Sequence, residues 1–137
     1  MKNKLSKKII LGTAQFGSKY GISNKTGVVN QIEIKKVIDY ANNNNINSID
    51  VAPSYGKAEN KLGKLKKLKN FKIYNKISKI NLNNKNTNYL IENEINNSLK
   101  LLNVNHFEGI FLHNPEDLLS KKGELIYDFL IEQKNNK

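Results

Sequence analysis

Ile46-Asn47-Ser48-Ile49-Asp50-Val51-Ala52-Pro53-Ser54-Tyr55-Gly56 (residues 46–56) reads as a short strand that ends in a carboxylate and continues into a turn-rich loop. Two later runs of the same kind, residues 72–76 and 109–113, also end in a reactive side chain. In a parallel β/α array, strand ends of one polarity lie on the same face of the sheet. The sequence therefore predicts that four side chains converge there: Asp50, Tyr55, Lys76 and His113.

The rest of the chain fits the same alternation of strands and amphipathic helices. Strands are predicted near residues 9–11, 46–50, 72–77 and 108–112. Helices are predicted from Asn30 to about residue 41, from Ala58, from Thr87 as the expected N-cap to about residue 102, and over residues 125–130. Asn30 with Glu33 has the spacing of a capping box, and residues 12–29 are expected to form a long loop. Alternation of this kind predicts an α/β fold, with a parallel sheet and crossover helices.

Composition excludes several classes of protein. The chain has 137 residues and a formal charge of +11, but it contains no Arg, and its Lys residues are scattered. A phosphate-binding face usually combines Arg with Lys and interleaved aromatics, so a nucleic-acid-binding module is only the third hypothesis. The absence of Cys rules out disulfides, thiolate metal ligands and a Cys nucleophile. No run of about 18 apolar residues is present, so we expect a cytoplasmic protein with no membrane partner.

Tyr, Lys, Asp and His together form a proton-donating set. Reduction of a carbonyl needs a positioned acid, because a proton must reach oxygen as hydride reaches carbon. A free phenol, with a pKa of about 10, is a poor donor at neutral pH, but a nearby ammonium favours the phenolate. The alternative is an ordinary loop Tyr, a surface Lys in a Lys-rich chain and a turn His beside Pro115.

Three further features have ordinary interpretations. Glu59 follows Ala58 at the predicted start of a helix, where a carboxylate interacts favourably with the helix dipole. Gly12 and Gly17 permit close approach of the backbone, which is weak evidence for a ligand. His106 is expected to be a polar residue that precedes a strand.

The motifs resemble the aldo/keto reductase family over nearly the whole chain. Residues 11–17 with 20–22 resemble the opening of the family, and Asp50-x-Ala-x-x-Tyr-Gly-x-x-Glu59 resembles its most specific block. Residues 75–76, 98–102 and 111–113 continue the match in order. The resemblance implies a TIM barrel, (β/α)₈, that reduces an aldehyde or ketone with NADPH or NADH. It further implies that Tyr55 is the general acid, Lys76 lowers its pKa, Asp50 partners Lys76 and His113 orients the carbonyl.

The sequence departs from the family in two substitutions and in length. Val51 stands where Thr is usual, and Asn75 where Thr or Ser is common; both are expected to adjust packing. A (β/α)₈ barrel needs about 250 residues, so residues 1–137 are expected to be one domain, the N-terminal half of a barrel with about four β/α units.

That length leads to three expectations about cofactor, activity and partners. Most of the cofactor site is expected in the second half, with only Gly12, Thr13 and Asp50 lining the cofactor side. We expect a truncated chain that is inactive alone and tends to self-associate through its open sheet edges. The alternative function is a non-catalytic fragment or interaction subunit that docks a complementary half-barrel. The sequence leaves the substrate, the choice of NADPH or NADH and the oligomeric state open.

Overall fold

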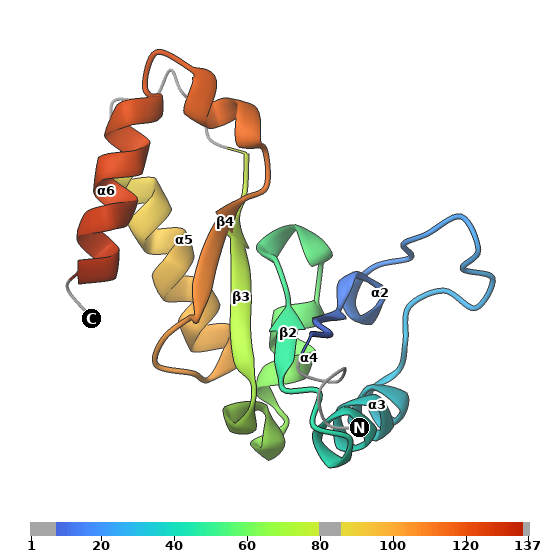
Figure 1. Ribbon diagram of the computed structural model, residues 1–137. Helices are drawn as coiled ribbons and strands as arrows, with labels where there is room; N and C mark the ends of the chain where they lie inside the picture. Colours follow the sequence, from blue (N-terminus) through green and yellow to red (C-terminus); the bar gives the residue numbers. More distant parts are fainter. Residues whose placement is uncertain (1–7, 80–85, 136–137) are drawn as a thin grey trace.

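A computed structural model describes residues 8–79 and 86–135 of the chain. It contains one parallel sheet whose four strands lie in chain order, β1-β2-β3-β4. The strands are β1 (Leu11–Gly12), β2 (Ser48–Asp50), β3 (Lys72–Ile77) and β4 (Gly109–Leu112). The longer helices are α3 (Gln31–Asn43), α4 (Ala58–Gly63), α5 (Thr87–Leu102) and α6 (Gly123–Asn135). Figure 1 shows β3 and β4 side by side, with their carboxyl ends at the top of the view.

Short helical turns join these elements. They are α2 (Ala14–Gly17), η1 (Pro53–Tyr55), η2 (Lys66–Asn70) and η3 (Pro115–Leu119). The sequence predicted neither α2, which lies inside the expected loop of residues 12–29, nor the short extent of β1. Beyond α2 the chain does form a loop, and Figure 1 shows it extending away from the sheet before α3 begins.

Two helix starts differ in detail from the prediction. Asn30 caps α3 as expected, because its side chain accepts a hydrogen bond from the backbone N–H of Glu33 at 3.0 Å. The Glu33 carboxylate pairs with Lys36 instead of completing a capping box. Thr87 is not the N-cap of α5: Asn86 occupies that position, and Thr87 is the buried first residue of the helix.

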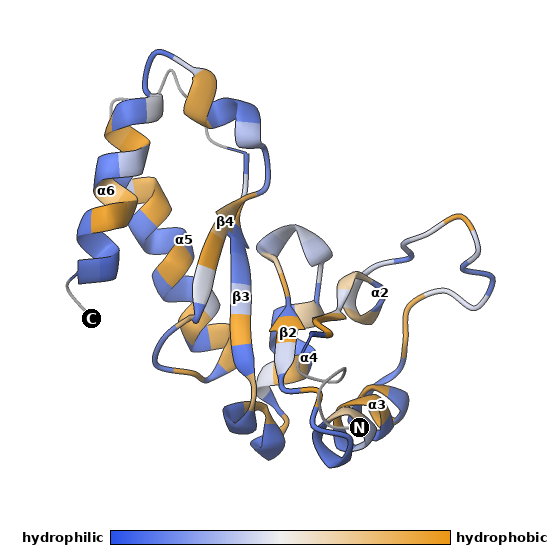
Figure 2. Cartoon of the chain, viewed as in Figure 1, coloured by the Kyte–Doolittle hydropathy of each residue, from blue (hydrophilic) through white to orange (hydrophobic). Residues whose placement is uncertain are grey.

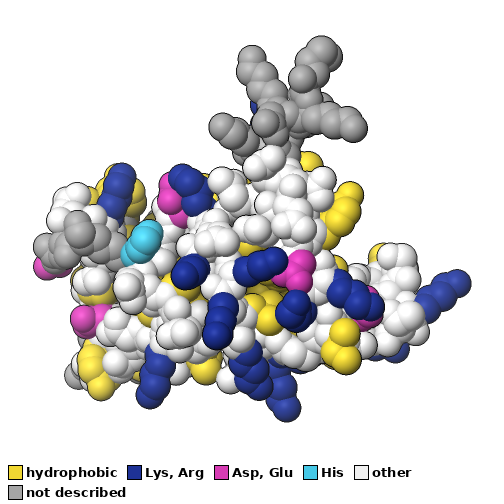
Figure 3. Space-filling model, turned by 90° about the horizontal axis from the view of Figure 1, so that it is seen from below, with side chains coloured by type: hydrophobic (Ala, Val, Ile, Leu, Met, Phe, Trp, Pro, Cys, Tyr) yellow, Lys and Arg dark blue, Asp and Glu magenta, His cyan; other side chains and the backbone are white. Residues whose placement is uncertain are grey.

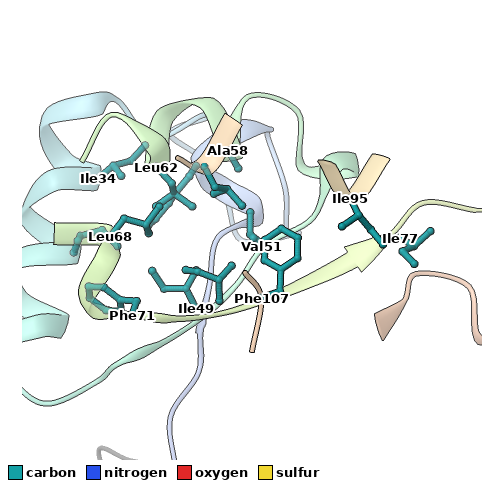
Figure 4. Packing of buried hydrophobic residues seen from close by; sticks show 14 of the residues in the cluster. Ile34, Ile49, Val51, Ala58, Leu62, Leu68, Phe71, Ile77, Ile95 and Phe107 are labelled. Carbon is teal, nitrogen blue, oxygen red and sulfur yellow. The ribbon is translucent and has the colours of Figure 1, made fainter. Parts of the chain in front are cut away.

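The core lies between the sheet and its helices. Side chains alternate along β3, so Ile73, Asn75 and Ile77 are buried while Lys72, Tyr74 and Lys76 face the other side. Figure 4 shows strand residues such as Ile49 and Ile77 packed with helix residues such as Leu62 and Ile95. The order of the strands and the crossovers through helices confirm the predicted α/β fold.

Within residues 8–79 and 86–135, β4 pairs with β3 alone, and part of the face of the sheet that carries Phe111 is exposed. Phe111 of β4 is 52% exposed, and its ring lies 6.2 Å from the ring of Tyr74, measured between centroids. Figure 2 shows β4 as largely hydrophobic beside the hydrophilic upper part of β3. Beside β4, an apolar groove of about 590 Å³ runs along α6 and is lined by residues that include Ile110, Leu118 and Ile131. The outer edge of β4, which no further strand among the described residues pairs, therefore lies next to hydrophobic surface.

Charged residues do not cluster in one patch on the face that Figure 3 shows. That view, from the end opposite the carboxyl ends of the strands, shows Lys side chains scattered among apolar and uncharged ones. Within residues 8–79 and 86–135, no helix has the length and apolar character needed to cross a lipid bilayer.

Candidate functional site

The candidate site lies at the carboxyl ends of β2, β3 and β4. β2 ends at Asp50, and the chain then turns through η1, which ends at Tyr55. Gly56 follows with a φ of 62°, a conformation that favours glycine. Gly17 of α2 contacts this turn so closely that a Cβ there would lie 1.6 Å from the carbonyl oxygen of Tyr55. The packing of α2 against the turn therefore fixes the backbone that carries Tyr55.

Three of the four predicted side chains form a closed hydrogen-bonded triangle. The Lys76 ammonium donates to the Tyr55 hydroxyl at 3.0 Å and also to a carboxylate oxygen of Asp50. The Tyr55 hydroxyl donates to the second Asp50 oxygen at 3.1 Å. The Lys76 Nζ also lies 5.1 Å from the centre of the Tyr55 ring. The structure thus brings together a phenol, an ammonium and a carboxylate that the sequence separates by up to 26 residues.

Electrostatics keep the ammonium protonated. Burial alone would lower the pKa of Lys76, but the hydrogen bonds and charges of Asp50 and Tyr55 outweigh it, so the pKa lies above the usual lysine value. The ion pair of Lys76 and Asp50 is partly buried, with side chains 21% and 27% exposed, and is less screened than a surface pair. A permanent positive charge therefore sits within hydrogen-bonding distance of the phenol.

His113 lies beside Tyr55, outside the triangle. Its backbone N–H donates to Ile77 O at 2.9 Å, which continues the pairing of β3 and β4 one residue past β4. The two rings are 6.4 Å apart between centroids and meet edge to face at 74°. His113 Nδ1 lies 3.3 Å from the hydroxyl of Ser54 in η1. The structure therefore brings the imidazole next to the phenol and leaves Nε2 as the ring nitrogen not contacted by Ser54.

Gly12 and Thr13, the other two residues expected on the cofactor side, lie in different surroundings. Gly12 pairs with Asp50 in the register of β1 and β2, and a Cβ at Gly12 would meet nothing within 4 Å. Thr13 is fully buried, and both its hydroxyl and its N–H donate to the carbonyl oxygen of Asp50, at 2.8 and 3.2 Å. Gly12 thus borders open space beside Asp50, whereas Thr13 acts on Asp50 through the backbone.

Sequence reasoning gave no site role to several residues that hold these elements together. Glu59 was interpreted as a carboxylate at a helix N-terminus, yet it is buried and hydrogen-bonded to Asn75 of β3 at 3.0 Å. Lys61 donates to two backbone carbonyls of the segment between β1 and α3, Phe16 O and Val29 O, both at 2.8 Å. The membership of Glu59 in the Asp50–Glu59 block could have indicated the first role, but one Lys among 23 cannot indicate the second.

Comparison with known proteins agrees with the fold described above. A profile of the Aldo/keto reductase family matches residues 8–134. A crystal structure named "putative aldo-keto reductase" from Pseudomonas aeruginosa superposes with a TM-score of 0.74 at 24% identity, covering 93% of this chain and 51% of its own. A second structure of that description from the same organism gives 0.72 at 24% identity, covering 93% and 49%. No curated protein matches the sequence.

These structural neighbours support the fold. The chain spans about half the length of the solved structures it matches, so its four β/α units correspond to a partial (β/α)₈ barrel, as predicted. The family match covers nearly all of the chain, from before β1 to the last turn of α6. Fold, motif order and family match agree, and the chain belongs to the aldo/keto reductase family.

Proposed function

We propose that this chain carries the acid–base half of an NAD(P)H-dependent carbonyl reductase. The triangle of Tyr55, Lys76 and Asp50 is the observation that carries the proposal, because it places a phenolic proton next to a fixed positive charge. Family membership supports oxidoreductase chemistry of this class. The substrate is an aldehyde or ketone, which the reaction converts into an alcohol.

Each side chain has a distinct task in the proposed reduction. Tyr55 gives its hydroxyl proton to the carbonyl oxygen, and the Lys76 ammonium stabilises the phenolate that this transfer leaves behind. Asp50 holds the ammonium in place. His113 donates from Nε2 to the carbonyl oxygen and so orients it, with Nδ1 held by Ser54. The oxygen thus receives a proton from a group whose resulting charge is already compensated.

When bound, a reduced nicotinamide would supply the hydride for this reduction. Gly12 and Asp50 fit a place beside this cofactor, because the missing side chain of Gly12 leaves open space next to the carboxylate. Thr13 supports that surface because its hydroxyl donates a hydrogen bond to the backbone carbonyl of Asp50. We propose that the second half of the barrel supplies the remaining contacts to the cofactor, since the chain spans about half the length of its structural neighbours.

The test is complementation with a second half-barrel. The chain is expected to oxidise NADPH with a generic aldehyde only when it is joined to, or mixed with, the four C-terminal β/α units of a family member. Tyr55→Phe keeps the ring and its contact with His113 and is expected to lower turnover by at least about 10²-fold. Equal turnover by wild type and Tyr55→Phe would refute the assignment of the acid.

A second candidate function is docking without catalysis. The groove beside β4 favours it, because Phe111 and Ile131 present apolar surface along a strand that, in the part of the chain that the structure describes, pairs on one side alone. We propose a polypeptide with four further β/α units as the occupant, pairing a parallel strand with β4. Mixing should then give a complex of one chain and one half-barrel in solution, and Phe111→Lys should weaken it. A complex that forms without NADPH turnover would favour this second function.

A further inference from the structure

A buried carboxyl group lies behind the proposed site, on the helix side of the sheet. Glu59 of α4 is 3% exposed and accepts hydrogen bonds from the Asn75 amide of β3, at 3.0 Å, and from the Ser98 hydroxyl of α5. Both of these donors are neutral. Burial raises the pKa of Glu59, the hydrogen bonds from Ser98 and Asn75 act in the opposite direction, and the charge of Glu94 adds to the rise. The Glu59 carboxyl therefore connects α4 with both β3 and α5.

Asn75 uses both ends of its amide. Its Nδ2 donates to Glu59 Oε1, and its Oδ1 accepts the backbone N–H of Lys76 at 2.6 Å. Asn75 is itself 3% exposed and points to the helices, whereas the side chain of Lys76 points to the site. One amide therefore links the buried carboxyl to the peptide group that carries the ammonium of the triangle.

The ladder of the sheet explains why this peptide needs such a partner. Val51 N–H donates to Tyr74 O, so the peptide groups of Tyr74 face β2, and by alternation those of Lys76 face the same side. The register of β2 with β3 ends at Asp50 opposite Tyr74, because the chain then turns into η1. β3 runs on to Ile77, so the Lys76 N–H lies beyond the last paired residue of β2. The Asn75 side chain provides the acceptor that β2 does not.

We propose that Asn75, oriented by Glu59, is a positioning residue for Lys76: it fixes the end of β3 where β2 no longer supports it, and so aims the ammonium at Tyr55 and Asp50. The value of this arrangement rests on the proposed function, because positioning matters only if the ammonium serves the phenol. The physical link itself does not depend on catalysis. A purely structural role for the Glu59–Asn75 pair would stabilise the core without affecting the contacts of Lys76.

The test measures Lys76 in the full chain by NMR, without substrate or cofactor. The variants Asn75→Val and Asn75→Thr introduce side chains of the same shape, but only Thr has a hydroxyl that can donate and accept hydrogen bonds. Val is expected to speed exchange of the Lys76 amide hydrogen by about tenfold and to bring the ammonium's pKa down toward that of an exposed lysine. Thr is expected to stay within about threefold of wild type. Ile77→Val, equally buried on β3, is the control and should leave both readings of Lys76 unchanged.

The outcomes separate this inference from the proposed function. Unchanged Lys76 exchange and titration in a folded Asn75→Val chain would overturn the positioning role, whether or not the assembled protein reduces a carbonyl. If the Asn75→Val variant does not fold, the test is hydrogen exchange of the Lys76 amide in the unmodified chain. Its Lys76 amide should exchange slowly although β2 does not pair with it, and rapid exchange would refute the hydrogen bond from Lys76 N–H to Asn75.

Discussion

Replacing Lys61 by Met should loosen the segment between β1 and α3 from the body of the protein. The Lys61 ammonium lies on α4 and donates to Phe16 O and Val29 O, both at 2.8 Å, so it joins the two ends of this segment. Gln31 at the start of α3 donates to Lys61 O at 2.9 Å and completes the connection. Met keeps the length and apolar stem of the side chain but removes both donors.

The expected loss follows from these two bonds. A hydrogen bond to a charged group contributes about 1.5–3 kcal/mol, which gives about 3–6 kcal/mol for two. Lys61 is partly exposed, so water replaces some of this interaction in the variant, and we expect a net loss of about 1.5–3 kcal/mol. At about 4 °C per kcal/mol for a domain of this size, the melting temperature should fall by about 6–12 °C.

Thermal unfolding followed by circular dichroism measures this change, and hydrogen exchange locates it. The Val29 amide, which donates to Gln15 O at 3.0 Å, should lose protection in Lys61→Met. Lys64→Met is the matched control, because it removes the same charge from an exposed position one residue past the same helix. A fall in Tm of less than about 2 °C, equal to that of the control, would refute the role given to Lys61.

Three further predictions concern stability. Because the folded pKa of Glu59 is raised, its protonation favours folding below the unfolded value of about 4.5, and this contribution is lost as pH rises through the folded pKa. Glu59→Gln should therefore gain stability relative to wild type as pH rises above about 4.5, and parallel urea curves across pH would contradict this. Gly17→Ala should lose at least about 3 kcal/mol in urea unfolding, because its Cβ would lie 1.6 Å from Tyr55 O. Gly12→Ala, with open space at that position, should change by less than about 0.5 kcal/mol.

The sequence allowed the fold and the meeting of the four side chains to be predicted. Strand periodicity and strand ends are local features, and in a parallel sheet local features determine which residues share a face. Asp50 is the last residue of β2 and Lys76 the last but one of the neighbouring β3, so their proximity followed from the order of the elements. The catalytic roles of these residues stay predictions until turnover is measured.

Other parts of the site depend on contacts that no local pattern contains. Glu59 has the same sequence context whether it faces solvent at a helix start or lies under β3, and only the packing of α4 against α5 decides between them. The sequence likewise does not distinguish Lys61 from the other lysines of the chain, 23 in all, because its role arises only when the segment between β1 and α3 packs against α4. Helix α2 spans four residues, too few to show a helical period.

The triangle of Tyr55, Lys76 and Asp50 draws all its atoms from one contiguous stretch of polypeptide. On the proposed function, the acid and its two partners all come from residues 50–76, whereas most contacts to the cofactor would come from the second half of the barrel. On that proposal, exchanging the second half between relatives would change most of the cofactor contacts, and with them the preference for NADPH or NADH, and would leave the three side chains of the triangle in place. Chimeric proteins could then be built in which residues 50–76 are kept constant and only the second half of the barrel is varied.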